Sequence, residues 1–234
     1  MTHAAGPAPL GGYVLAGGHS SRMGRDKALL SLAGKPLAEH AVTKLRRICS
    51  DVSILSANLA LAAFAPIVPD IHPNSGPIGG IEAALKLTTY DWNLLLPVDM
   101  PLLPGAVVER WVFNQLRSYS SGTLRPGIRI LTADGRPQPG LCLIHKALAP
   151  FITSAIQRGH FALLSVFEEA GKEAGYHFSG SALPPMGKES PTSSGPFQMQ
   201  LTSAQRAAQH LWFLNLNTKE DLALAAAHSA ALDT

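Results

Sequence analysis

The chain has 234 residues, of which 46% are hydrophobic and 15% are charged, so it can bury a large core and is not a disordered chain. The net charge is only +3, and the basic residues are scattered rather than grouped with aromatics, which argues against a nucleic-acid-binding protein. Cys49 and Cys142 have no disulfide or zinc spacing, the first residues do not resemble a signal peptide, and no apolar run is long enough for a membrane span. We therefore expect a cytoplasmic protein that does not bind membranes.

Short apolar runs alternate with helical patterns in the first half of the chain, which is typical of beta-alpha-beta units. The pattern predicts strands at 13–16, 52–57, 67–68 and 93–98. It predicts helices that begin near Pro36, cover 79–87 and follow Pro104. The strand at 93–98 is the most apolar, so we expect it in the middle of a mainly parallel sheet, buried on both faces.

The second half is less regular. Strands are predicted at 128–131 and 141–144 around a turn at Asp134 and Gly135, and helices at 147–157 and 161–170. Ser, Pro and Gly make up 12 of the 18 residues at 179–196, which predicts a loop. A strand at 211–216 and an Ala-rich helix capped by Thr218 and Asp221 follow. We expect one domain over 1–234, a doubly wound α/β fold with helices on both faces and a flexible insertion at 179–209.

The segment 15–30, LAGGHSSRMGRDKALL, directly follows the first strand and combines glycines with positive charges. Backbone N–H groups freed by glycine, with nearby cations, form a phosphate cradle. The cradle residues are Gly17, Gly18, Arg22, Gly24, Arg25 and Lys27. The spacing matches neither GxxxxGK[ST] nor GxGxxG, and the glycines are equally typical of a plain turn. A hydrolase elbow at Ser20 lacks its second glycine, because Arg22 stands there.

Two further motifs follow strands. Asp99 lies at the carboxyl end of the most buried strand, where it could hold a hard cation against phosphate oxygens. An aspartate between Pro97 and Pro101 is also typical of a turn. The sequence GPIGG at 76–80 enters a helix, where free N–H groups suit an anion or a base edge, or where glycine allows tight packing. The histidines show no metal-binding spacing.

Taken in order, LAGGHSSRMGRDKALL, SILSAN, Pro69-Asp70, GPIGG, PVDMPLLP and FLNLNTKEDL resemble the molybdenum cofactor guanylyltransferases of the nucleotidyltransferase superfamily. The resemblance covers residues 11–116 and 211–222. It implies a fold like that of the nucleotide-diphospho-sugar transferases, with GTP and Mg²⁺ bound and GMP transferred to the terminal phosphate of molybdopterin. The LAGG form resembles the guanine-selecting members. The implied partners are GTP, molybdopterin or molybdenum cofactor, and cofactor-delivery or molybdoenzyme proteins.

The resemblance also implies roles for individual residues. Arg22, Lys27 and Asp99 would be catalytic, with Arg22 and Lys27 on the triphosphate and Asp99 on Mg²⁺. The GTP site would comprise Leu15, Ala16, Gly17, Gly18, Lys27, Ser56, Asn58, Asp70, Gly76 and Asp99, and Asn215 and Asn217 would lie where the pterin docks. Lys219, the GPIGG form and the insertion at 179–209 depart from the family pattern, but no required charge is missing.

The chemistry is compatible with these residues, because nucleotidyl transfer depends on positioning and charge neutralisation rather than on a covalent catalyst. Two alternatives stay open. One is another nucleotidyltransferase, which uses CTP on molybdopterin or acts on a sugar phosphate. The other is a non-catalytic nucleotide-binding protein, against which the intact Lys27 and Asp99 argue.

Overall fold

One central sheet organises the described part of the chain. The computed structural model describes residues 8–17, 26–120, 126–182 and 200–233. Its seven-stranded sheet has the order β5-β4-β1-β6-β8-β7-β9, and β8 runs antiparallel to both of its neighbours while the other pairs are parallel. The strands are β1 (Ala8–Leu15), β4 (Cys49–Leu55), β5 (Ile67–Val68), β6 (Trp92–Pro97), β7 (Gly127–Ala133), β8 (Arg136–His145) and β9 (His177–Ala182). A separate hairpin pairs β2 (Ser31–Leu32) with β3 (Lys35–Pro36).

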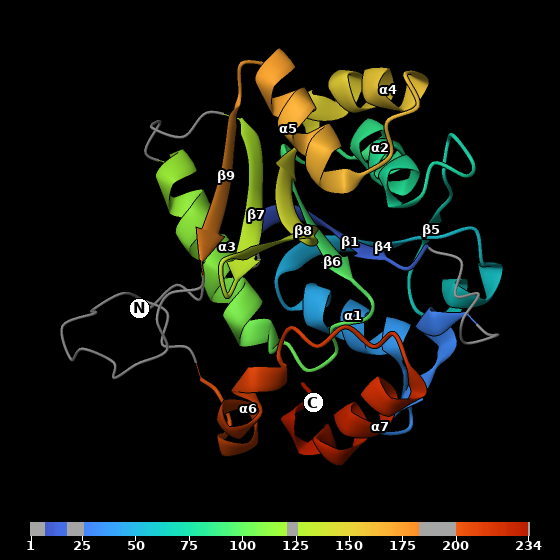
Figure 1. The fold of residues 1–234 in the computed structure, drawn as a ribbon, viewed down its shortest axis with the longest axis vertical. Helices are drawn as coiled ribbons and strands as arrows, with labels where there is room; N and C mark the ends of the chain where they lie inside the picture. Colours follow the sequence, from blue (N-terminus) through green and yellow to red (C-terminus); the bar gives the residue numbers. More distant parts are fainter. Residues whose placement is uncertain (1–7, 18–25, 121–125, 183–199, 234) are drawn as a thin grey trace.

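Helices lie on both faces of this sheet (Figure 1). On one face lie α2 (Pro77–Leu87), α4 (Ala149–Gln157) and α5 (Leu163–Glu173). On the other lie α1 (Leu37–Arg46) and α3 (Gly105–Ser120), with α6 (Ser203–Ala207) and α7 (Lys219–Ala227) farther from the sheet. Short 3-10 helices occur at η1 (Lys27–Leu29), η2 (Leu59–Ala63), η3 (Lys146–Leu148), η4 (Gln209–Leu211) and η5 (Ser229–Ala231). The doubly wound, mainly parallel architecture predicted from the sequence is confirmed.

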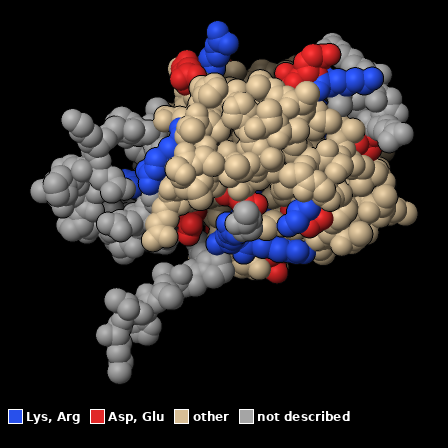
Figure 2. Space-filling view, turned by 90° about the horizontal axis from the view of Figure 1, so that it is seen from below, with Lys and Arg blue, Asp and Glu red and all other residues tan. Residues whose placement is uncertain are grey.

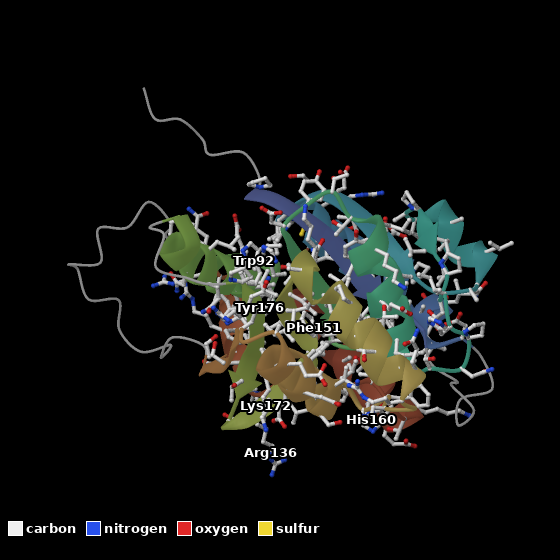
Figure 3. All side chains as sticks on the ribbon, turned by 90° about the horizontal axis from the view of Figure 1, so that it is seen from above. Trp92, Arg136, Phe151, His160, Lys172 and Tyr176 are labelled. Atoms are coloured by element: carbon white, nitrogen blue, oxygen red, sulfur yellow. The ribbon has the colours of Figure 1, made fainter. Side chains whose placement is uncertain are left out.

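The central strands are buried on both sides. In β6, Leu94 and Leu96 belong to the core formed with α1 and α3, whereas Leu95 belongs to the core formed with α2, α4 and α5. Figure 3 shows α4 and α5 lying across the sheet, where Phe151 and Tyr176 pack against the second core. Because successive side chains of a strand point to opposite faces, two helical layers require the continuous apolar run seen in β6.

The carboxyl ends of β1, β4 and β6 meet at one edge of the sheet. Leu15, the last residue of β1, is in register with Leu55 of β4 on one side and with Pro97 of β6 on the other. Because β8 is antiparallel to β6, Trp92 at the start of β6 and Arg136 at the start of β8 lie at opposite ends of the strands (Figure 3). The chain passes from β1 to β4 on one side and returns to β6 on the other, and open α/β sheets bind ligands at such a switch point.

The predicted turn signals have their expected geometry. Asp134 and Gly135 both have positive φ angles in the hairpin between β7 and β8. Thr218 and Asp221 form a reciprocal capping box at the start of α7. Pro36 lies one position earlier than expected, since it is the N-cap of α1 rather than its first helical residue.

The strand predicted at 211–216 is wrong. Leu211 ends the 3-10 helix η4, and the residues after it belong to no strand. The apolar residues of this run are instead buried against the α1 and α3 side of the core, as seen for Leu211, Trp212 and Leu216. The N–H of Leu216 donates to the carbonyl of Asp99 at 3.0 Å instead of to a strand.

The loop predicted at 179–196 also begins too early. Residues 179–182 belong to β9, which pairs in parallel with β7 at the edge of the sheet. The indole N–H of Trp111 donates to the Ser181 hydroxyl at 2.7 Å, which ties β9 to α3. At the other end of the expected insertion, 203–207 form α6. Residues 183–199 lie outside the described ranges, so a flexible insertion stays a prediction.

Figure 2 shows the side of the molecule that carries α6 and α7. Lys and Arg side chains are interspersed with Asp and Glu around a broad uncharged area. Within the described residues, no helix combines the length and the apolar character needed to cross a membrane.

Candidate active site

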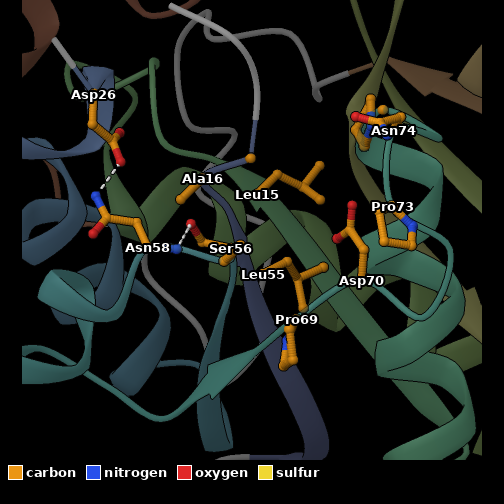
Figure 4. A pocket seen from close by; sticks show the side chains of 15 residues that line it. Leu15, Ala16, Asp26, Leu55, Ser56, Asn58, Pro69, Asp70, Pro73 and Asn74 are labelled. Atoms are coloured by element: carbon orange, nitrogen blue, oxygen red, sulfur yellow. Dashed lines mark hydrogen bonds between the residues drawn. The ribbon is translucent and has the colours of Figure 1, made fainter.

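A cavity of about 630 Å³ opens at the carboxyl ends of β1, β4 and β5 (Figure 4). Its walls include the predicted site residues Leu15, Ala16, Gly17, Ser56, Asn58, Asp70 and Gly76. These residues come from segments far apart in the sequence that the parallel strands bring to one edge. The volume falls within the range of small-molecule sites.

Asp70 forms one wall of the cavity, against the start of α2. A Cβ placed on Gly79 would lie 3.2 Å from Asp70 Oδ2, and one placed on Gly80 would lie 3.2 Å from Oδ1. The glycines of GPIGG therefore allow the carboxylate to approach the helix closely. Burial raises the pKa of Asp70 above its usual value. Two carboxylate oxygens at the cavity wall can accept from adjacent N–H donors of a ligand.

Gly76 has the backbone conformation that most requires glycine. It is the N-cap of α2, with φ 65° and ψ −157°, and it lines the cavity. That region of φ and ψ is essentially restricted to glycine. Gly17 is different, since its φ is not positive and a Cβ there would lie 3.6 Å from the Leu55 carbonyl oxygen, an ordinary contact.

Asn58 links the cavity to the segment that follows β1. Its side-chain amide donates to Asp26 Oδ2 (Figure 4), and its Oδ1 accepts from the N–H of Ala60 at 3.0 Å. Asp26 in turn caps η1 by accepting from the N–H of Ala28 at 2.9 Å. The next residue, Lys27, is the first of η1. The Asp26–Asn58 contact therefore fixes the start of η1 and, with it, the position of the Lys27 backbone.

Lys27, Asp99 and Asn217 form a second cluster beside the cavity. Lys27 Nζ lies 3.0 Å from Asp99 Oδ2 and donates to Asn217 Oδ1 at 2.8 Å. Asp99 follows β6, whose end is held to β1 by the N–H of Val98 on the Leu15 carbonyl. Three of the predicted site residues, from the first, middle and last parts of the chain, thus converge.

Asn217 is held by the capping box of α7. The Asp221 carboxylate accepts from the N–H groups of Asn217 at 2.9 Å and Thr218 at 2.8 Å. These hydrogen bonds, that from Asn217 first, lower the pKa of Asp221. The Asn217 amide is thereby presented to Lys27.

Asp99 has the features of a cation ligand. Its Oδ2 faces Lys27, whereas Oδ1 is buried and has no hydrogen-bond partner among the described residues. A buried carboxylate oxygen without a partner is costly, and a hard cation would satisfy it. No three His, Cys, Asp or Glu side chains converge in the described ranges, so a cation here would take its remaining ligands from water and from a bound phosphate.

Glu82 was missed by the sequence analysis, although it supports the cavity wall. It is wholly buried in α2, and its carboxylate accepts from Lys86 at 2.7 Å and Thr153 at 2.6 Å and contacts His72 Nδ1 at 2.6 Å. Burial raises its pKa, but the hydrogen bonds from Lys86, Thr153 and His72 outweigh that effect and hold the pKa below its usual value. Glu82 therefore ties the segment after Asp70 to α2 and α4.

Not every predicted residue joins these clusters. Arg22 and Gly18 lie outside the described ranges, as do His19 and Ser20 of the hydrolase alternative. Asn215 is half-buried in the segment before Asn217. Asp26 was missed, and its position as an N-cap before Lys-Ala-Leu is the signal that could have revealed it.

A small-molecule cavity at a topological switch point, beside a lysine and an aspartate whose buried oxygen has no partner among the described residues, fits a nucleotidyltransferase. The family model described as the MobA-like NTP transferase domain matches residues 12–173. The chain belongs to this family, which confirms the resemblance seen in its motifs.

Curated relatives support the same family. The molybdenum cofactor guanylyltransferase of Serratia proteamaculans is 33% identical over 90% of this chain and 90% of its own length. That of Vibrio atlanticus is 37% identical over 68% of this chain and 81% of its own length.

Solved structures show the same fold. Molybdopterin-guanine dinucleotide biosynthesis protein A from Archaeoglobus fulgidus has a TM-score of 0.65 at 20% identity, over 95% of this chain and all of that one. The 2-C-methyl-D-erythritol 4-phosphate cytidylyltransferase of Thermus thermophilus has a TM-score of 0.59 at 15% identity, over 95% and 99%.

Proposed function

We propose that this nucleotidyltransferase transfers GMP from GTP to the terminal phosphate of molybdopterin. An oxygen of the acceptor phosphate attacks the α-phosphorus of GTP, the bond from that phosphorus to the bridging oxygen breaks, and pyrophosphate leaves. The observation that carries the proposal is the Lys27–Asp99–Asn217 cluster beside a nucleoside-sized cavity. The names of the curated relatives support this choice of substrates.

The cavity suits a guanine base. Guanine presents two adjacent donors, its ring N1–H and its exocyclic amino group, and the Asp70 carboxylate at the wall can accept from both. Cytosine would turn a ring acceptor toward the same carboxylate, which is unfavourable. Leu15 and Ala16 would pack on the nucleoside, and the Ser56 hydroxyl, which already accepts from the N–H of Asn58, can still donate to it.

The negative charge of the triphosphate would be neutralised by Lys27 and by a cation held on Asp99. The Lys27 ammonium would bind the triphosphate, and Asp99 would hold Mg²⁺ through Oδ1, which has no hydrogen-bond partner among the described residues. Mg²⁺ would supply neutralisation of the phosphate oxygens and favour departure of pyrophosphate. Arg22, outside the described ranges, would add a second positive charge.

The segment 213–218 would contact the acceptor. Asn217 already reaches Lys27, and Asn215 lies two residues before it. We also propose that the enzyme works in the cytoplasm with cofactor-delivery or molybdoenzyme partners. Its free cysteines, Cys49 and Cys142, are buried, in keeping with a reduced compartment.

The test is a guanylylation assay on molybdopterin with Mg²⁺, with detection of the dinucleotide by mass and of pyrophosphate. GTP should give product, while CTP and UTP should not. Product from CTP, or from a sugar phosphate acceptor, would indicate another nucleotidyltransferase. GTP binding without pyrophosphate release would indicate a non-catalytic protein.

A further inference from the structure

Lys44 is a buried charged residue with no part in the proposed reaction. It lies on α1, its side chain is only 2% exposed, and it does not line the cavity. Its ammonium donates to the main-chain carbonyls of Met100 at 3.4 Å and Pro101 at 3.2 Å. These residues directly follow Asp99. Burying an ammonium is costly, so its presence here calls for a physical role.

The counter-ion of Lys44 holds the other end of the same loop. Asp233 Oδ2 lies 3.8 Å from Lys44 Nζ and accepts from the N–H of Gly105 at 2.8 Å. Gly105 is the first residue of α3. Asp233 Oδ1 accepts from the side-chain amide of Gln205 in α6 at 3.1 Å. The loop between β6 and α3 is thus fixed at its start by Lys44 and at its end by Asp233.

The packing around the pair leaves little freedom. A Cβ on Gly105 would lie 3.2 Å from Lys44 Cγ and 3.3 Å from Asp233 Oδ2. Between the two attachment points, Leu102 and Leu103 are buried in the core. Apolar side chains of similar volume could fill the same space, but they could not bind two carbonyls and an N–H group in fixed directions.

We propose that the Lys44–Asp233 pair positions Asp99 for cation binding. By fixing the carbonyls of the next two residues and the end of the loop, the pair keeps Asp99 Oδ1 in its buried orientation, in which it has no partner within the described part of the chain. The inference rests on the proposed function, because it requires the cation to bind at Asp99. Lys44 and Asp233 are positioning residues and touch neither nucleotide nor acceptor.

Lys44→Met and Asp233→Asn test the proposal. Mn²⁺ binding is measured by electron paramagnetic resonance with GTP present and the acceptor omitted, so the readout does not depend on turnover. Each variant should bind Mn²⁺ about tenfold more weakly, the lower end of the loss seen when support for a metal ligand is removed. Guanosine affinity without metal should be unchanged, because the pair lies away from the cavity.

Lys146→Met is the control for loss of a Lys–Asp pair, although Lys146 is 41% exposed and Lys44 only 2%. Lys146 also pairs with an aspartate, Asp91 at 3.1 Å, and also donates to a carbonyl, that of Thr89 at 3.5 Å, but at the opposite end of β6. The Mn²⁺ affinity of the Lys146→Met variant should equal that of the parent protein. If Lys44→Met or Asp233→Asn fails to fold, the double variant, which removes both charges together, takes its place.

The outcomes are distinct. Variants that lose thermal stability but keep the parent Mn²⁺ affinity would overturn the proposal and leave the pair a structural feature. Asp99→Asn separates this failure from that of the proposed function. If it weakens Mn²⁺ binding while the Lys44 and Asp233 variants do not, only the positioning role is lost. If it also leaves Mn²⁺ affinity unchanged, the cation does not bind at Asp99 and the proposed site fails as well.

Discussion

Lys27 Nζ lies 3.0 Å from Asp99 Oδ2, although the two residues are 72 positions apart in the sequence. The contact joins the segment after β1 to the end of β6. It spans the switch point at which the strands added to the sheet change from one side of β1 to the other. The two side chains are 18% and 21% exposed, so they are held in place yet accessible. A bound triphosphate can therefore meet both without rearrangement of the core.

Lys27→Ala should leave the fold intact and lower turnover by about 10²- to 10³-fold, as expected when one preorganised charge-stabilising group is removed. Pyrophosphate release measures turnover, and thermal unfolding checks the fold. Lys35→Ala is the control, since Lys35 is about half exposed and pairs only loosely with Glu39 at 3.8 Å. Near-normal turnover of the Lys27 variant would remove this residue from the chemistry.

Gly76→Ala should destabilise the protein by about 1 to 3 kcal/mol, because alanine is strained at φ 65° and ψ −157°. GTP affinity should fall too, since Gly76 lines the cavity. Urea unfolding gives the stability. Gly17→Ala is the matched control for stability alone, because a Cβ there makes only an ordinary contact with Leu55 and needs no positive φ, although Gly17 also lines the cavity. Equal unfolding midpoints for both variants would contradict the prediction.

The sequence predicted the parts of the fold that local patterns encode. β6 was recognisable because both faces of the strand are buried, and Asp99 was recognisable because it follows that strand, at the edge where ligands bind in this topology. Gly76 stood out as a glycine-rich helix entry, and Asp70 was implied only by the family resemblance. β9 was missed because its sequence, HFSGSA, is polar and contains glycine, so its pairing with β7 rather than its composition makes it a strand. The strand predicted at 211–216 was wrong for the opposite reason. Its apolar residues pack into the core without pairing as a strand.

Contacts between distant polar residues that the family resemblance did not imply could not be predicted. Asp26 with Asn58, and Lys44 with Asp233, are joined only by the folded topology, and no spacing in the chain relates them. In the sequence, Glu82 is indistinguishable from an exposed charged residue of a helix. Its buried contacts with α4 and with the segment after Asp70 exist only in the folded protein.

The pH dependence of stability should report on Lys44. Burial lowers its pKa from 10.5 to about 8, although the Asp233 carboxylate opposes this effect. Between these values the unfolded chain binds more protons than the folded one, so this group's contribution to stability rises with pH. The cost of burying the ammonium is present in full below about pH 8 and is relieved as the pH approaches 10.5.

Lys44→Met isolates that contribution. The free energy of unfolding of the parent protein, minus that of the variant, should increase from pH 8 toward pH 10.5, because only the parent carries the titrating amine. Urea unfolding at several pH values measures the difference. A difference that stays constant over this range would mean that Lys44 keeps its ordinary pKa in the folded protein.

Asp99→Asn separates the two interpretations of this residue. A turn aspartate is replaced well by asparagine, since both side chains make the same local backbone bonds. Among the described residues, however, Asp99 Oδ2 faces Lys27 and Oδ1 has no partner, so the side chain makes no such local bond. Asparagine keeps the size and an acceptor oxygen for Lys27 but removes the charge that a hard cation requires.

The asparagine variant should therefore fold normally and bind GTP weakly through the cavity, while turnover falls by at least about 10²-fold because the phosphate charge is no longer neutralised. Turnover is measured as a function of Mg²⁺ concentration. Asp91→Asn, at the opposite end of β6, should match the parent, since Asp91 is 56% exposed and pairs only with Lys146 among the described residues. Parent-like turnover and Mg²⁺ dependence in Asp99→Asn would move the cation elsewhere, and with it the assignment of the Lys27–Asp99–Asn217 cluster as the reaction centre.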